Sequence, residues 1–148
     1  MAAFKMAADA DLQTSFCRYS SRTIEIKARE YLFRQGEEAR GCYLIKRGVL
    51  SLFMESSSGK RILGRELGEG CIVGLPATIN GNPLSLTCRV VEDAEVAFLS
   101  RKDLMELMRK DVSAAMKILD LLSTEVQSTR KQAARYARPP KHSSPSER

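Results

Sequence analysis

The segment CYLIKRGVLSLF, residues 42–53, decides the fold of this chain. It contains two short, mostly apolar runs, residues 42–45 and 49–53, on either side of Lys46-Arg47-Gly48. Runs of four or five residues have strand length rather than helix length, and glycine tolerates the positive φ that a turn requires. The segment therefore predicts two strands separated at Gly48.

Apolar runs of similar length lie on both sides of this segment. Glycines separate them at short intervals, and the clearest hairpin joins residues 52–54 to residues 61–63 through the turn at 55–60. Regularly spaced short strands are typical of a sandwich or a barrel. We therefore expect a mainly β domain, whose further strands are residues 23–26, 30–33, 87–91 and 96–99.

Helices are predicted before and after these strands. Residues 7–19 carry Leu12 and Phe16 four positions apart, which predicts a short amphipathic helix. Ser100 is an N-cap residue with an acidic residue three positions later, so a helix is expected to begin there. A second, longer helix is predicted over residues 111–135.

The long predicted helix carries apolar side chains on two sides. Its heptad seam predicts a homodimer interface formed by Val112, Ala115, Leu119, Leu122 and Val126, and continued by Thr129 and Ala133. A second side is expected to rest on the β domain and consists of Met116, Ile118 and Leu121. The alternative is that both sides pack within one monomer.

Length and charge indicate one domain and no extended basic surface. The chain has 148 residues, of which 43% are hydrophobic, and a formal net charge of +6. Residues 129–148 alone carry +5, so the basic excess belongs to a solvated end. The chain divides into four segments. They are an N-terminal helical segment (1–19), a β-roll (20–110), a long helix (111–136) and a basic tail (137–148), which we expect to be disordered because Pro139-Pro140 ends the helix. Residues 1–16 contain neither a signal peptide nor a membrane span, so we expect a cytoplasmic protein.

Cysteine and histidine usage gives no support for a metal or catalytic centre. Cys17, Cys42, Cys71 and Cys88 occur singly and are expected to be buried structural thiols. The one histidine, His142, falls in the predicted tail. We therefore predict no metal site, no catalytic residues and no enzymatic activity.

Four stretches resemble the cyclic-nucleotide-binding domain family. They are YLFRQGE (31–37), CYLIKRGVL (42–50), LGEGCIVG (67–74) and VVEDAEVAFL (90–99). The resemblance covers about residues 20–131. It implies a double-stranded β-helix, or jelly roll, followed by a short and a long helix, as in the sensor domain of catabolite-activator-type bacterial regulators.

The same resemblance implies a ligand site in a cassette from Gly74 to Thr87. In the family a glycine-led helical turn and an arginine hold the cyclic phosphate, and a glutamate accepts a ribose hydroxyl. Here the glutamate position falls on Leu75 and the arginine position on Leu84, while the nearby Arg89 is expected to point elsewhere. The implied ligand-binding residues are Val73, Gly74, Leu75, Pro76, Ala77, Leu84, Ser85 and Leu86, and the candidate lid residues on the long helix are Ser123, Thr124, Gln127 and Ser128.

With leucine at both charged positions, cyclic AMP or cyclic GMP is expected to bind weakly or not at all. Only thirteen residues follow Arg135, too few for a helix-turn-helix module, so we expect no DNA-binding domain in this chain and no membrane partner. The predicted function is a non-catalytic regulatory or sensor domain.

Other functions remain as alternatives. The first is a protein-interaction module that acts through the long helix and the basic tail. The second is a genuine cyclic-nucleotide-binding domain of a transcription regulator, and a haem or redox sensor is the third. An enzyme on a related cupin-like roll is disfavoured because no histidine precedes His142.

Overall fold

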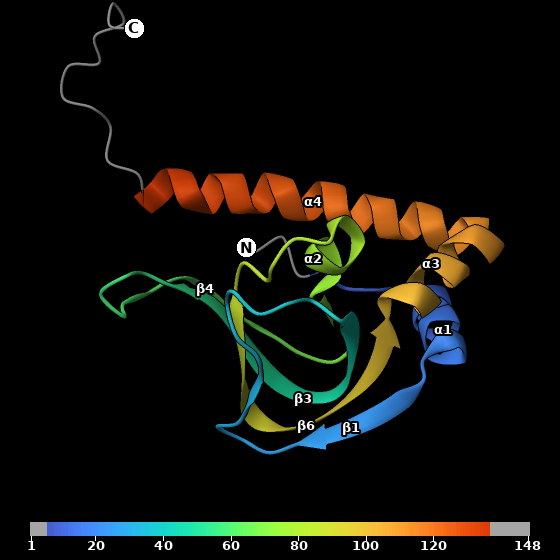
Figure 1. Cartoon of the computed structure of the whole chain (residues 1–148), viewed down its shortest axis with the longest axis horizontal. Helices are drawn as coiled ribbons and strands as arrows, with labels where there is room; N and C mark the ends of the chain where they lie inside the picture. Colours follow the sequence, from blue (N-terminus) through green and yellow to red (C-terminus); the bar gives the residue numbers. More distant parts are fainter. Residues whose placement is uncertain (1–5, 137–148) are drawn as a thin grey trace, which may run out of the picture.

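The strands form one antiparallel sheet that curls into a cup (Figure 1). The computed structural model describes residues 6–136, with the backbone alone for Leu63 and for residues 125–136. Strands β1 (Arg22–Ile26), β6 (Thr87–Ser100), β3 (Gly41–Glu55) and β4 (Arg61–Leu67) pair in that order, while β2 (Tyr31–Phe33) pairs with β6 and β5 (Ile72–Val73) pairs with β3. The predicted mainly β-roll with flanking helices is confirmed.

The two longest strands correct the predicted strand boundaries. The runs on either side of Gly48 belong to one strand, β3, and the runs at 87–91 and 96–99 belong to β6. Gly48 has φ +99°, and a Cβ there would lie 2.6 Å from the Ala94 Cα atom. This glycine therefore permits a close approach of β3 to its sheet neighbour β6, where the register of their pairing shifts, rather than a turn.

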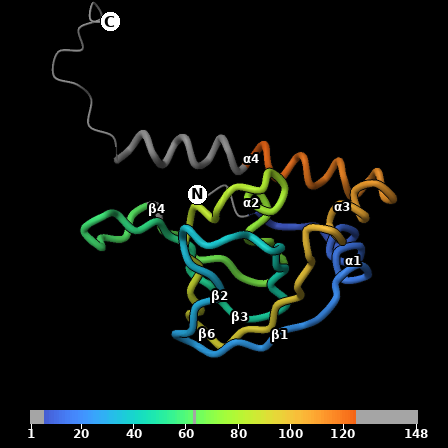
Figure 2. The backbone as a smooth tube through the Cα atoms, in the orientation of Figure 1, coloured from blue at the N-terminus to red at the C-terminus, as the bar shows by residue number. Residues whose placement is uncertain are grey.

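The predicted hairpin is confirmed. Met54 pairs with Ile62 and Glu55 pairs with Arg61, and the turn that joins them projects from the cup (Figure 2).

Helices α1 (Ala10–Tyr19) and α3 (Arg101–Lys110) lie at one end of the cup, and α4 (Val112–Tyr136) runs from α3 past α2 (Leu75–Asn80) (Figure 1). The Ser100 hydroxyl accepts a hydrogen bond from the Asp103 amide, as the predicted N-cap requires. The expected start of the first helix was too early, because Asp9 caps α1 and Ala7 forms an isolated bridge to Cys71.

Two apolar clusters make up the core. One, the helix-side cluster, lies between the helices and the outside of the cup and includes Leu12 and Phe16, both fully buried. The other fills the inside of the cup and includes Phe33, Leu50 and Val96. The inner cluster bounds the site described below.

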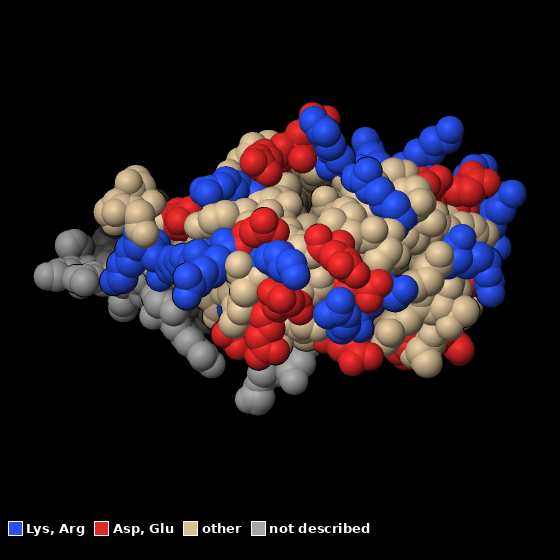
Figure 3. All heavy atoms as spheres, turned by 90° about the horizontal axis from the view of Figure 1, so that it is seen from below, with Lys and Arg blue, Asp and Glu red and all other residues tan. Residues whose placement is uncertain are grey.

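The surface carries charges of both signs. Figure 3 shows basic and acidic side chains interspersed over the face seen there, which fits the small net charge of the chain outside residues 129–148. Among the described residues, no helix is long and apolar enough to cross a membrane. The predicted tail at 137–148 and His142 lie outside the described residues.

Candidate functional site

The segment between β5 and β6 begins with a short helical turn, α2 (Leu75–Asn80). Gly74 precedes it with φ +81°, a conformation that favours glycine. The Thr78 amide and hydroxyl both donate to the Gly74 carbonyl oxygen, at 3.2 and 2.7 Å. Pro76 lies in the first turn and removes one backbone N–H from the end of the helix that a phosphate would approach.

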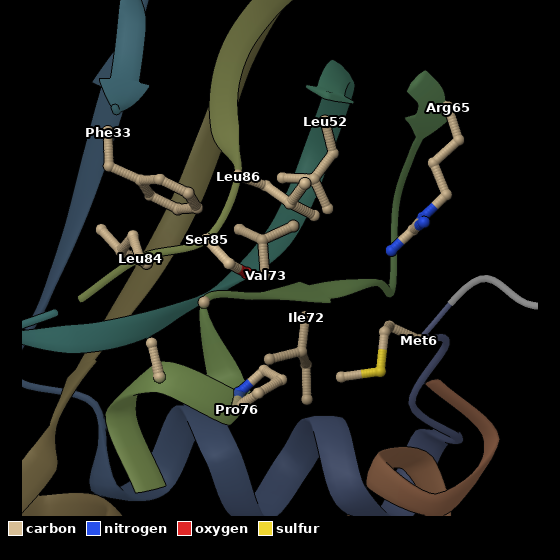
Figure 4. Close-up of a pocket in the computed structure, with 12 residues that line it drawn as sticks. Met6, Phe33, Leu52, Arg65, Ile72, Val73, Pro76, Leu84, Ser85 and Leu86 are labelled. Carbon is tan, nitrogen blue, oxygen red and sulfur yellow. The ribbon is translucent and has the colours of Figure 1, made fainter. Parts of the chain in front are cut away.

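A cavity of about 50 Å³ lies beside this turn, inside the cup (Figure 4). Its walls are mostly apolar and come from the N-terminal segment, β2, β3, β4, β5, α2 and the chain that leads into β6. Seven of the eight residues that the resemblance implied line it: Val73, Gly74, Pro76, Ala77, Leu84, Ser85 and Leu86.

Leu75 is the residue of that set that the structure does not bring to the cavity. It is fully buried and packs in the helix-side cluster with Leu12, Phe16 and Leu104. Successive residues of a helical turn point about 100° apart, so Pro76 and Ala77 face the cavity while Leu75 faces the helices. Leu75 is therefore a core residue in this structure and not part of the cavity wall.

Leu84 does form part of the wall. Its side chain is 7% exposed. Two hydrogen bonds hold its backbone to the turn after β2. The Leu84 amide donates to the Glu37 carbonyl oxygen at 2.9 Å, and the Gly36 amide donates to the Leu84 carbonyl oxygen at 2.8 Å. Arg89 points elsewhere, as predicted, and donates to the Arg29 carbonyl oxygen at 3.1 Å. An apolar side chain therefore lines the cavity at the position where the resemblance implies an arginine.

A larger, more polar depression of about 430 Å³ lies on the other side of Leu84 and Phe33. Its charged lining residues are Glu37, Glu38 and Arg40. Since two carboxylates face one guanidinium, this depression does not suit a negatively charged ligand.

The sequence analysis missed five residues that line the cavity: Met6, Phe33, Leu52, Arg65 and Ile72. Arg65 pairs with Leu52 across β3 and β4, so the two side chains share one face of the sheet. The alternation of β4 could have found it, because Arg65 lies two positions before the buried Leu67. Met6 has no such signal, since it arrives through a non-local contact in which the Ile72 amide donates to its carbonyl oxygen at 3.0 Å.

The candidate lid is not assembled by the described residues. Ser123 and Thr124 are exposed on α4 and are not among the residues that line the cavity. The side chains of Gln127 and Ser128 lie outside the described part of the chain.

Some residues of the predicted dimer seam are exposed, and others are partly buried. Val112 and Leu119 are 71% and 51% exposed, whereas Ala115 and Leu122 are partly buried. The Val126 side chain lies outside the description. On the second side, Ile118 is fully buried and Leu121 packs on the helix-side cluster, as expected.

Met116, which was expected to rest on the β domain, is instead 60% exposed. It lies four residues after Val112 and three before Leu119, so these three side chains share one face of the helix. The exposed apolar stripe therefore consists of Val112, Met116 and Leu119.

Three of the four cysteines are buried thiols, and Cys17 is exposed on α1. The prediction of burial was wrong for Cys17, which lies on the solvent side of an amphipathic helix. Burial raises the pKa of Cys42 and of Cys88 to about 12, so neither thiol ionises near neutral pH. Among the described residues, no cluster of three or more potential ligands could hold a metal ion.

Comparison with known families matches most of the chain to one domain type. Residues 23–111 match the model of the cyclic nucleotide-binding domain. Human patatin-like phospholipase domain-containing protein 6 is 28% identical over 101 residues, which are 68% of this chain but 7% of that protein. The chain thus spans a small fraction of that relative's length.

Solved structures share the fold at low sequence identity. Thermus thermophilus catabolite activator protein superimposes with a TM-score of 0.76 at 21% identity, over 85% of this chain and 59% of that one. The c-di-GMP-responsive global regulator CLP of Xanthomonas campestris superimposes with a TM-score of 0.73 at 22% identity, over 86% of this chain and 62% of that one.

Proposed function

The chain belongs to the cyclic nucleotide-binding domain family, and from that membership we propose that it is a non-catalytic sensor domain whose nucleotide site has lost its charged anchors. The observation that carries the proposal is the position of Leu84. It lines the cavity at the place that the resemblance gives to the arginine, and it offers no charge to a phosphate. Leu75, at the glutamate position, is buried in the core and presents no acceptor to a ribose hydroxyl.

The size of the effect supports weak binding. Removing one partner of a buried charge pair costs about 2–5 kcal/mol, which weakens affinity by about 30- to 5,000-fold. The cavity of about 50 Å³ is also small beside the roughly 300–1,000 Å³ of small-molecule sites. Charge and volume therefore both favour weak, absent or altered binding of cyclic AMP and cyclic GMP.

A change of ligand specificity is supported as well as a loss of cyclic AMP binding. CLP is described as responsive to c-di-GMP, and it shares this fold at 22% identity. The fold therefore serves a regulator that responds to a nucleotide other than cyclic AMP. We assign no catalytic activity to the chain, because its match to the phospholipase-domain protein covers only 7% of that relative.

A thermal-shift panel of cyclic AMP, cyclic GMP and c-di-GMP tests the proposal. A ligand present at a hundred times its dissociation constant stabilises a folded protein by about 2.7 kcal/mol. We expect no such stabilisation by micromolar cyclic AMP. The Leu84→Arg variant is the matched comparison, and it should gain a cyclic-nucleotide response that the natural chain lacks. Strong stabilisation of the natural chain by micromolar cyclic AMP would contradict the proposal.

We also propose that the domain forms a homodimer through α4. The exposed stripe of Val112, Met116 and Leu119 supports this, because its spacing of four and three lets it pack against a second copy of the same helix. Sedimentation at high micromolar concentration should show a dimer. Leu119→Asp should give monomer, whereas Thr124→Asp, at an exposed polar position outside the stripe, should remain dimeric. Monomer alone for the natural chain would refute the interface.

We further propose a cytoplasmic location. Cys17, Cys42 and Cys88 are thiols that form no disulfide in the described part of the chain, and reduced thiols are typical of a reducing compartment.

A further inference from the structure

The cavity contains one charged side chain that comes from outside the cassette. Arg65 lies on β4 directly opposite Leu52 of β3, and both side chains line the cavity. Figure 4 shows the Arg65 side chain reaching from β4 toward Val73 and the hollow beside it. Its backbone position therefore directs a guanidinium inward, on the opposite side of the cavity from Leu84.

The surroundings of this guanidinium are apolar. Among the described residues that line the cavity, Arg65 is the one ionisable side chain and Ser85 supplies a hydroxyl, while the opposing walls come from Phe33, Leu52 and Leu86. A charge at an inward strand position costs free energy unless charged or polar groups offset its desolvation. Arg65 also interacts with another group of the chain. The features that suit a ligand are the inward direction of the Arg65 side chain and the apolar walls around it.

We propose that the cavity binds a small apolar carboxylate, whose carboxylate pairs with Arg65 and whose apolar body contacts Phe33, Leu52 and Leu86. This assignment rests on the proposed function, since it names the ligand class of the same sensor site. A planar guanidinium matches two carboxylate oxygens through two parallel hydrogen bonds. The apolar walls then exclude water from the rest of the ligand.

The same features disfavour a sugar phosphate. A ribose needs hydroxyl partners, and the lining supplies one side-chain hydroxyl, from Ser85. Pro76 removes a backbone donor from the turn that would meet the phosphate. The volume of about 50 Å³ also limits the ligand to a short body unless a wall moves.

Met6, which is 4% exposed, is the wall that we expect to move. It is an unbranched, flexible side chain that enters the cavity from the N-terminal segment. Its backbone has φ +51°, a strained conformation for a residue other than glycine. Longer carboxylates should therefore bind by displacing Met6, and Met6→Ala should favour them over short ones.

Isothermal titration calorimetry with matched ligands tests the assignment. The probes are butyrate, hexanoate, octanoate and benzoate, with 1-hexanol and methyl hexanoate as neutral counterparts and cyclic AMP as the nucleotide. Hexanoate should bind at least about ten-fold more tightly than 1-hexanol, because a hydrogen bond to a charged group is worth about 1.5–3 kcal/mol. Arg65→Gln should abolish this preference.

Arg61→Gln is the control variant, since Arg61 lies on the same strand and stacks over Phe53 without lining the cavity. It should keep the preference, and Arg65→Lys should keep part of it. Equal affinity for acid and alcohol, or an Arg65→Gln variant that binds hexanoate normally, would overturn the assignment. So would the absence of carboxylate binding up to about 10 mM. Tight binding of cyclic AMP would instead overturn the proposed function, whatever the carboxylates do.

Discussion

Replacing Leu75 and Leu84 separately by alanine tests whether Leu75 belongs to the core and Leu84 to the cavity wall. Leu75 is 0% exposed and packs against α1 and α3 residues in the helix-side cluster. Leu75→Ala leaves a hole in close-packed surroundings, and such changes cost about 2–5 kcal/mol of unfolding free energy. Leu84 already borders a cavity, and its neighbours Pro83 and Ser85 are exposed, so the chain there can collapse around the smaller side chain. We expect Leu84→Ala to cost at least about 1 kcal/mol less than Leu75→Ala.

Urea unfolding followed by far-ultraviolet circular dichroism measures both values. Equal slopes of free energy against denaturant concentration for the two variants would show that they expose similar surface on unfolding. A cost below about 1 kcal/mol for Leu75→Ala, or an equal cost for Leu84→Ala, would refute the placement of the two residues.

The positions of Leu75 and Leu84 also determine whether a charged residue introduced there can reach the cavity. Leu75→Glu would introduce a carboxylate into the core cluster rather than into the cavity, so it should destabilise the fold strongly and should not create a ribose contact. Leu84→Arg would place its charge at the cavity wall. Introducing the two charged residues that the resemblance implies is therefore expected to have opposite consequences at the two positions.

Two further predictions concern protonation. At pH 8, iodoacetamide should alkylate Cys17 in the folded protein and spare Cys42 and Cys88, because burial raises the pKa of these two thiols to about 12. In denaturant every thiol should react. Mass spectrometry that found Cys42 or Cys88 labelled before Cys17 would contradict their burial. The pKa of Asp111 is lowered by the hydrogen bond from the Ala114 amide and then by that from the Ser15 hydroxyl. A lowered folded-state pKa contributes stability above the ordinary aspartate pKa, and this stability is lost as pH falls through the folded-state value. The difference in melting temperature between the natural chain and Asp111→Asn should thus shrink from about pH 5 to about pH 3, and a constant difference would exclude the contribution.

Local signals in the sequence predicted the features that depend on local chemistry. Ser100 caps α3 because a side-chain hydroxyl and an amide three residues later need nothing from the rest of the fold. The hairpin between β3 and β4 was equally accessible, since its turn lies between adjacent apolar runs. Gly48 misled the prediction because a positive φ is compatible both with a turn and with an irregular stretch of a paired strand, and only the approach of Ala94 distinguishes them.

The site depended on contacts that a linear sequence does not display. The motif placed Leu75 and Leu84 in the cassette but did not state which way each side chain points. That direction follows from the rotation of α2 against α1 and α3. Met6 was missed because it is brought to the cavity by pairing with β5, far along the chain. Arg65 was missed, although the alternation of β4 predicts its inward direction, because the family's cassette includes no residue of β4.

Calorimetric titration of the natural chain with cyclic AMP, alongside Leu84→Arg, tests the central claim most directly. The claim is that an apolar side chain stands where the phosphate needs a cation. It predicts a dissociation constant weaker than about 100 μM, or no measurable heat, for the natural chain, and at least about ten-fold tighter binding by Leu84→Arg. A low-micromolar dissociation constant for the natural chain would contradict it.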